Sequence, residues 1–223
     1  MNDHNTGKEA LDRQQRHWRK MYAEHVDMFG KERSYPARRA AEIFGTSGAK
    51  KILELGSGQG RDTLFFARRG FQTYALDYSE EGLHAIQKKA DTLGLSPSLT
   101  TICHDVRQRL PFEDNSFDGC YSHMLYCMAL TTPELEFLSQ EVHRVLKPGG
   151  LNIYTVRHTA DPHYRMGIDR GDDMWEIQGG FIVHFFSKEK VEHLAKGYDI
   201  VGVEEFEETD LPKKLFLVIL KKS

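Results

Sequence analysis

A short apolar segment that runs directly into three alternating glycines constrains the fold of this chain more than any other feature. The residues KILELGSGQGRD begin at Lys51, and their apolar positions indicate a buried strand at 52–55. The glycines that follow are Gly56, Gly58 and Gly60. Glycines at such a turn let the backbone approach a ligand closely, and the N-terminus of the next helix favours anionic groups. Because a tight structural turn needs the same residues, the loop alone does not identify a ligand.

Strand-like and helix-like segments alternate from residue 51 to residue 156. The pattern predicts strands at 52–55, 73–76, 99–103, 117–121 and 151–156, and helices at 63–69, 80–93 and 132–146. Ser79 is expected to cap the second of these helices, and Thr132 the third, with Pro133 at its first position. Such alternation requires βαβ crossovers and a parallel sheet covered on both faces. Two more apolar runs, at 198–206 and 215–220, are expected to add closing strands.

The predicted fold is therefore α/β: a Rossmann-like, mostly parallel, seven-stranded sheet with helices on both faces. Residues 1–45 are expected to form an N-terminal helical extension, because apolar residues recur there on one helical face. These residues are Leu11, Trp18, Tyr22, Val26 and Phe29. The main domain then covers residues 46–223, with residues 157–186 as a lid insertion after the fifth strand.

An acid at the end of the second strand points to a nucleoside ligand. Asp77 follows Gly56 by 21 residues, where a carboxylate can accept hydrogen bonds from the hydroxyls of a ribose. As a strand-end carboxylate it is expected to contribute little to packing. A dinucleotide fingerprint, G-x-G-x-x-G, would need glycine at Arg61 or Thr63, so NAD and FAD are disfavoured. An NAD-dependent oxidoreductase and a non-catalytic nucleoside-binding protein remain as alternatives.

From Lys51 to Val156 the chain resembles class I S-adenosylmethionine-dependent methyltransferases. Their loop reads E-x-G-x-G-x-G, and Glu54 with the three glycines matches it. The remaining motifs follow in the expected order: ALDYS at 75–79, Asp105-Val106, LPFEDNSFD at 110–118 and RVLKPGG at 144–150. The string GQGRDT at 58–63 is also similar to the loop of tellurite-resistance and thiopurine-type methyltransferases.

The resemblance implies S-adenosylmethionine as cofactor and a role for each matching residue. Asp77 would hold both ribose hydroxyls, Asp105 the adenine amino group, and the Val106 N–H the base edge. The loop would pack against the methionine portion, whereas Asp62 either meets its ammonium group or only complements the helix dipole. The candidate cofactor residues are Glu54, Gly56, Ser57, Gly58, Gly60, Asp62, Asp77, Tyr78, Ser79, Asp105, Val106 and Ser122.

The methyl acceptor is expected beside the segment that follows the fourth strand. In this family, enzymes that methylate base amines or glutamine amides carry an N-P-P-Y-like tetrad there, and this chain has Ser122-His123-Met124-Leu125 instead. Histidines and aromatics in the insertion suit a small-molecule pocket, although a lid with solvated charges would have the same composition. The candidate substrate residues are Tyr22, His123, Tyr126, Arg157, His158, His163 and His184.

The chemistry of the acceptor decides whether a base is needed. A hydroxyl or amine must lose a proton, and His123, nearest the expected methyl position, is the candidate catalytic base. A soft sulfur, selenium, tellurium or arsenic nucleophile needs none, and positioning then does most of the work. The histidine spacings match no familiar metal-ligand pattern, so no metal is predicted.

Charge and composition narrow the partners. Lys and Arg number 30 against 33 Asp and Glu, a net charge of −3, which does not suit nucleic-acid binding. The longest apolar run, 215–220, is too short to span a bilayer, and the polar N-terminus does not resemble a signal peptide. Three cysteines without a C-x-x-C pair indicate free thiols in a reducing cytoplasm. The sequence thus predicts a cytoplasmic small-molecule methyltransferase and leaves its oligomeric state open.

Overall fold

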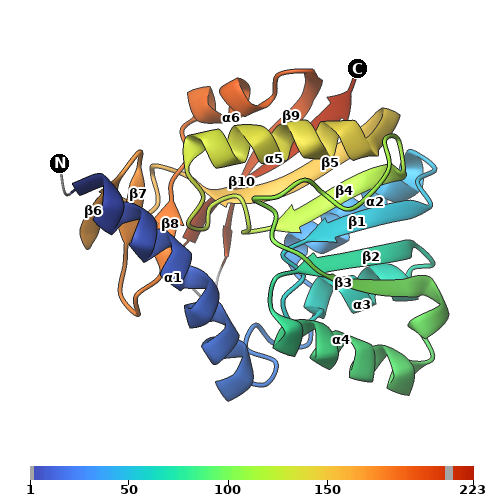
Figure 1. The fold of residues 1–223 in the computed structure, drawn as a ribbon. Coiled ribbons are helices and arrows are strands. Elements are labelled where there is room, and N and C mark those ends of the chain that lie inside the picture. The colour runs from blue at the N-terminus through green and yellow to red at the C-terminus, as the bar shows by residue number, and fades with distance from the viewer. Residues whose placement is uncertain (1–2, 209–212) are drawn as a thin grey trace.

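The described residues build one seven-stranded sheet with a smaller sheet beside it (Figure 1). The computed structural model of the chain describes residues 3–208 and 213–223. The main sheet has the order β3-β2-β1-β4-β5-β10-β9. Its strands are β1 Lys51–Leu55, β2 Gln72–Asp77, β3 Leu99–Cys103, β4 Phe117–His123, β5 Leu146–Arg157, β9 Tyr198–Glu208 and β10 Lys213–Lys222. Strands β1 to β5 pair in parallel and β10 is antiparallel to both neighbours, so the predicted Rossmann-like sheet is confirmed.

Helices cover both faces of this sheet (Figure 1). They are α1 Asp3–Glu24, α2 Tyr35–Thr46, α3 Arg61–Arg68, α4 Glu80–Leu93, α5 Thr132–Val145 and α6 Lys188–Leu194, with a 3₁₀ turn, η1, at Ser96–Ser98. Side chains of β4 alternate between the two faces, as strand geometry requires. Cys120 packs in the core that includes Leu138 of α5, and Tyr121 packs in the core that includes Phe44 of α2.

The helix starts follow from their caps. Ser79 caps α4 as predicted, and its Oγ accepts a hydrogen bond from the Gly82 N–H at 3.2 Å. The predicted cap of α5 is wrong by one residue. Thr131 caps this helix because it forms a capping box with Glu134. The Thr132 hydroxyl instead donates to Asp172 of the insertion, at 2.6 Å.

The N-terminal segment is not one continuous helix. The chain leaves α1 at Glu24, and Asp27 has a positive φ of 52°. The prediction that one apolar helical face extends to Phe29 is therefore wrong beyond Glu24, where the helix ends, and Val26 is 84% exposed. The predicted boundary at residue 45 falls inside α2, whose Phe44 is fully buried in the main core. The part of the chain that stands apart from this core thus precedes α2.

The insertion after β5 forms structure that the sequence did not predict. It contains a three-stranded antiparallel sheet of β6 Ile168–Gly171, β7 Met174–Glu176 and β8 Ile182–His184. This sheet lies beside α1 (Figure 1). The Gln14 side chain donates to the Gly180 carbonyl at 2.9 Å and accepts from the Ile182 N–H at 3.2 Å. Within the described part of the chain, no helix has the length and apolar character needed to cross a membrane.

Candidate functional site

The loop between β1 and α3 depends on its glycines. Gly56, Gly58 and Gly60 have φ values of 71°, 52° and 84°, in the left-handed region that other residues rarely adopt. The Gly56 N–H donates to the Leu76 carbonyl at 2.8 Å, which fixes the turn against β2. A Cβ on Gly60 would lie 2.5 Å from a side-chain carbon of Ile86. The predicted tight turn at the carboxyl edge of β1 is therefore present.

Asp77 holds this loop from the end of β2. One carboxylate oxygen accepts a hydrogen bond from the Gly58 N–H and the other from the Ser79 N–H, each at 2.8 Å. Asp77 is only 6% exposed, and burial raises the pKa of its carboxyl. The expectation of a carboxylate with little packing role is wrong, because Asp77 organises the loop. Each oxygen keeps a lone pair with which it can accept a ligand hydroxyl.

Buried polar atoms without partners lie next to this loop. Among the described residues, the Oγ atoms of Ser57 and Ser122 are buried and make no hydrogen bond. Leu55 pairs with Ser122 across β1 and β4, so both serines lie at the same edge of the sheet. His104, whose N–H donates to the Asp77 carbonyl, likewise has a buried, unpaired Nε2. Since unpaired buried polar groups are costly, this edge fits a polar ligand that would satisfy them.

Asp105 is already engaged by a cation. Its carboxylate accepts from the Arg107 guanidinium at 2.8 Å, and although burial opposes ionisation, these hydrogen bonds hold the pKa of Asp105 low. Arg107 also contacts Asp12 of α1 at 2.7 Å. Val106 is buried and packs in the main core. Asp105, which was predicted to bind adenine, is therefore joined through Arg107 to Asp12 of α1.

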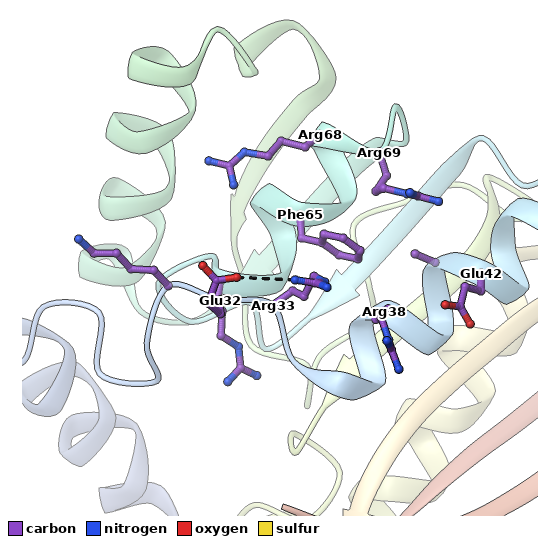
Figure 2. Close-up of a pocket in the computed structure, with 10 residues that line it drawn as sticks. Glu32, Arg33, Arg38, Glu42, Phe65, Arg68 and Arg69 are labelled. Atoms are coloured by element: carbon purple, nitrogen blue, oxygen red, sulfur yellow. Dashed lines mark ion pairs between the residues drawn. The ribbon is translucent and has the colours of Figure 1, made fainter. Parts of the chain in front are cut away.

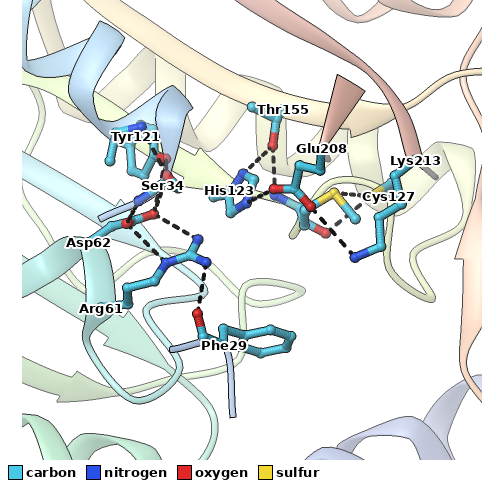
Figure 3. A network of polar contacts seen from close by, with 12 residues as sticks. Phe29, Ser34, Arg61, Asp62, Tyr121, His123, Cys127, Thr155, Glu208 and Lys213 are labelled. Carbon is cyan, nitrogen blue, oxygen red and sulfur yellow. Dashed lines mark hydrogen bonds and ion pairs between the residues drawn. The ribbon is translucent and has the colours of Figure 1, made fainter. Parts of the chain in front are cut away.

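Asp62 has a structural position. Its oxygens accept from the Ser34 N–H and hydroxyl, each at 2.8 Å, and from the Tyr121 hydroxyl at 3.2 Å (Figure 3). The Arg61 guanidinium completes the set at 3.2 Å. Burial opposes ionisation, but Arg61 and His123 lower the pKa of Asp62. The carboxylate is only 4% exposed. These contacts join α3 to the start of α2. They give no support to the interpretation that Asp62 meets the ammonium group of the cofactor's methionine portion.

Glu54 is likewise turned inward. Its carboxylate accepts from the Thr63 hydroxyl at 2.5 Å, and burial raises its pKa well above the usual range. With 3% exposure, it supports the first turn of α3 from below rather than offering a surface to a ligand.

Helix α1 covers the glycine loop. A Cβ on Gly58 would lie 2.9 Å from the Tyr22 hydroxyl, so Tyr22 sits directly over the loop. Arg19 donates to the Tyr78 carbonyl at 3.1 Å. Sequence reasoning missed Gly82, where a Cβ would overlap the Gly58 carbonyl oxygen. Its position in the first turn of α4, five residues after Asp77, is the signal that could have found it.

His123 lies at the carboxyl end of β4 in a second polar network (Figure 3). Its Nδ1 is 2.8 Å from the Thr155 hydroxyl, and its Nε2 is 3.1 Å from a Glu208 oxygen. Burial opposes ionisation of Glu208, but His123 and Lys213 bring the pKa of that carboxyl down to about 2. An ionised Glu208 requires a proton on Nε2. The Thr155 hydroxyl oxygen accepts a hydrogen bond from the Met124 N–H, so the hydroxyl proton is available to be donated to His123 Nδ1.

Glu208 was not found from the sequence. It is 85 residues from His123 and reaches it only because β10 brings β9 back toward the sheet edge. No local motif marks it.

The other predicted substrate residues are part of the framework. Tyr126 is fully buried and stacks on Tyr154 with 4.3 Å between ring centroids. The Arg157 guanidinium binds Asp161 at 2.5 Å and is 2.8 Å from His163. The Tyr126 hydroxyl accepts from the Asn152 amide of β5 at 3.4 Å. The interpretation of these residues as pocket lining has no support in the contacts, because their polar atoms bond to other protein groups.

Two histidines of the insertion are also structural. The His158 ring stacks on Phe216, and its Nδ1 accepts from the Ala160 N–H at 3.1 Å. His184 is fully buried, with Nδ1 2.7 Å from the Leu130 carbonyl oxygen, and burial beside Lys190 lowers its pKa to about 4. Within the described ranges, no group of three or more His, Cys, Asp or Glu side chains is placed to hold a metal ion.

Comparisons with known proteins agree with this geometry. Residues 52–150 match the family model described as a methyltransferase domain. The chain is 31% identical over 143 residues to 24-methylenesterol C-methyltransferase 2 of Arabidopsis thaliana, covering 60% of this chain and 38% of that protein. It is 27% identical to a rice protein of the same name, covering 78% and 46%. The chain thus spans less than half the length of these curated relatives.

Solved structures show the same fold. The 1,6-didemethyltoxoflavin-N1-methyltransferase of Burkholderia thailandensis, with S-adenosylhomocysteine bound, has a TM-score of 0.71 at 17% identity, covering 92% of this chain and 84% of that one. TehB of Haemophilus influenzae has a TM-score of 0.62 at 17% identity, covering 84% and 61%. The predicted resemblance to class I S-adenosylmethionine-dependent methyltransferases is confirmed: residues 52–150 match the methyltransferase-domain model, and the fold agrees with it.

Proposed function

We propose that this chain binds S-adenosylmethionine and transfers its methyl group to a small-molecule acceptor. The observation that carries the proposal is the buried Asp77 carboxylate, which holds the Gly58 N–H and keeps lone pairs free at the edge of the sheet. The matching family and the solved relative with S-adenosylhomocysteine support the same ligand. The comparisons give no support to the oxidoreductase alternative, which the displaced third glycine already disfavours.

The residues present fit this cofactor at its ribose and methionine ends. Asp77 would accept from the ribose hydroxyls, and the unpaired Ser57 and Ser122 hydroxyls would meet polar atoms beside the glycine loop. At the adenine end, a hydrogen bond to Asp105 has to be shared with Arg107. When bound, S-adenosylmethionine supplies an already activated methyl group, so the chain's own task is to bind, orient and exclude water.

His123 is our candidate for the acceptor side of the site. Its side chain is 12% exposed at the end of β4, between Thr155 and Glu208. With Nδ1 accepting from Thr155 and Nε2–H donating to Glu208, neither ring nitrogen has a free lone pair. Because the ring lone pair lies on Nδ1, a hydroxyl or amine acceptor could give its proton to His123 only after it replaces the Thr155 hydroxyl there. A soft nucleophile would need no such exchange.

The choice of a small molecule rests on three features. The net charge of −3 does not favour a nucleic-acid acceptor. Relatives are named for sterol and toxoflavin-type substrates. Helix α1 covers the glycine loop and the insertion lies beside α1, an arrangement that suits an enclosed acceptor. We also infer a reducing compartment, the cytoplasm, because all three cysteines are free thiols.

Binding and turnover must be tested separately, because a [4+2]-cyclase also has this fold, with a TM-score of 0.63. We expect calorimetry to show binding of S-adenosylmethionine and S-adenosylhomocysteine and none of NAD. Incubation with methyl-labelled S-adenosylmethionine and fractionated cell metabolites should then label a small product. Binding without any labelled product would favour the non-catalytic alternative, and binding of NAD alone would contradict the proposal.

A further inference from the structure

A basic pocket lies between α2, α3 and the segment that precedes α2 (Figure 2). It has a volume of about 360 Å³, within the range of small-ligand sites. Six cationic side chains line it: Lys31, Arg33, Arg38, Arg61, Arg68 and Arg69. With only Glu32 and Glu42 as acids, the formal charge of the lining is 6 − 2 = +4, whereas the whole chain carries −3.

Half of these cations have a carboxylate partner. Arg61 binds Asp62 at 3.2 Å, Lys31 is 3.8 Å from Asp27, and Arg33 is 3.6 Å from Glu32. The other three, Arg38, Arg68 and Arg69, form no ion pair with any residue that the structure describes. Arg68 in the last turn of α3 also complements the helix dipole, but that does not explain cations gathered from three segments.

We propose that this pocket binds a small anion that carries more than one phosphate group. Guanidinium groups bind phosphate oxygens in bidentate fashion, and several unpaired ones in one hollow favour several phosphates. Phe65 is half-buried in the wall, with the Arg33 guanidinium 5.7 Å from its ring centroid, and offers an apolar surface to the rest of such a ligand. Asp77 and His123 do not line this pocket. The proposal therefore does not depend on methyl transfer.

The test is calorimetric titration with tripolyphosphate and inorganic phosphate, with S-adenosylhomocysteine present to block the glycine loop. We expect tripolyphosphate to bind more tightly than inorganic phosphate. The double variant Arg68→Gln/Arg69→Gln should weaken tripolyphosphate binding by about tenfold or more, since one charge-assisted hydrogen bond is worth about that factor. Both side chains are exposed, so the variant should fold. The matched control is Arg13→Gln/Arg16→Gln, two exposed arginines of α1, which should change the affinity less than about twofold.

A second measurement locates the ligand in the wild-type protein. The Nε–H resonances of Arg38, Arg68 and Arg69 should shift during the tripolyphosphate titration. Absence of binding, equal weakening by both double variants, or shifts confined to other arginines would overturn the proposal. Tighter binding of a short single-stranded oligonucleotide than of tripolyphosphate, lost in the same variant, would overturn the small-ligand assignment.

Discussion

Replacing Asp77 separates its two roles, in the loop and in the cofactor site. In the free protein the carboxylate accepts one backbone N–H on each oxygen and is only 6% exposed. Asp77→Ala leaves both donors unpaired, at about 1–3 kcal/mol each. It also removes a buried charge whose pKa is raised by desolvation, which offsets part of that cost. We expect a loss of about 2–4 kcal/mol in the free energy of unfolding.

Asp77→Asn is the sharper variant, because it is isosteric and keeps one acceptor oxygen. We expect it to cost about 1–2 kcal/mol of stability at neutral pH. A raised pKa means that the stabilisation by protonated Asp77 is full at low pH and is lost as pH rises through the folded-state pKa. The amide of the Asp77→Asn variant does not titrate, so it causes no such loss of stability as pH rises. Urea unfolding should therefore show the wild type losing stability relative to Asp77→Asn as pH rises above about 4.

The effect on cofactor binding should be larger than the effect on stability. Two charge-assisted hydrogen bonds to ribose hydroxyls are worth about 3–6 kcal/mol together, or roughly 10²–10⁴-fold in affinity. Asp77→Ala should lose all of this and Asp77→Asn about half, measured by calorimetry with S-adenosylhomocysteine. Glu80→Gln, an exposed carboxylate three residues away, is the control and should bind normally. Wild-type affinity in folded Asp77→Asn would refute the ribose assignment.

Three further substitutions test other parts of the site and fold. Gly82→Ala places a Cβ against the Gly58 carbonyl and should weaken S-adenosylhomocysteine binding in calorimetry, whereas Gly45→Ala, with open space around it, should not. His184 has a pKa of about 4, so stability should fall by about 2 kcal/mol from pH 7 to pH 5, and His184→Gln should reduce that slope in urea unfolding. His123→Asn should reduce turnover about 10²–10⁴-fold if the acceptor needs a base, and far less if it is a soft nucleophile.

The sheet and its loop could be predicted because their signals are local. An apolar run of strand length, a capping Ser79 and a carboxylate 21 residues after Gly56 each follow from neighbouring residues. Parallel strands end at one edge, so the position of Asp77 beside the glycine loop also follows once the strands are known. The contacts of Asp62 could not be predicted, because its partners Ser34 and Tyr121 are distant from it in sequence.

The insertion could not be interpreted in the same way. Its strands have only three or four residues, too few for periodicity to indicate a sheet. Histidine and arginine among aromatics suggested a pocket, but composition does not show whether polar groups face a ligand or each other. Asp161 binds Arg157 four residues earlier and the Lys214 N–H from β10, at 3.0 Å. That second contact depends on the tertiary fold.

The distribution of satisfied and unsatisfied polar groups indicates where ligand chemistry belongs. Polar side chains of the insertion such as Arg157 and His184 have partners within the protein, whereas the buried Ser57 and Ser122 hydroxyls have none among the described residues. An unpaired buried polar group costs about 1–3 kcal/mol, so ligand recognition is better placed at the sheet edge than in the insertion. The insertion contacts α1 instead: Phe181 packs on Trp18 with 4.9 Å between ring centroids, and Trp18 lies four residues before Tyr22. Changes in Phe181 should therefore alter the position of α1 over the glycine loop rather than the chemistry at β4.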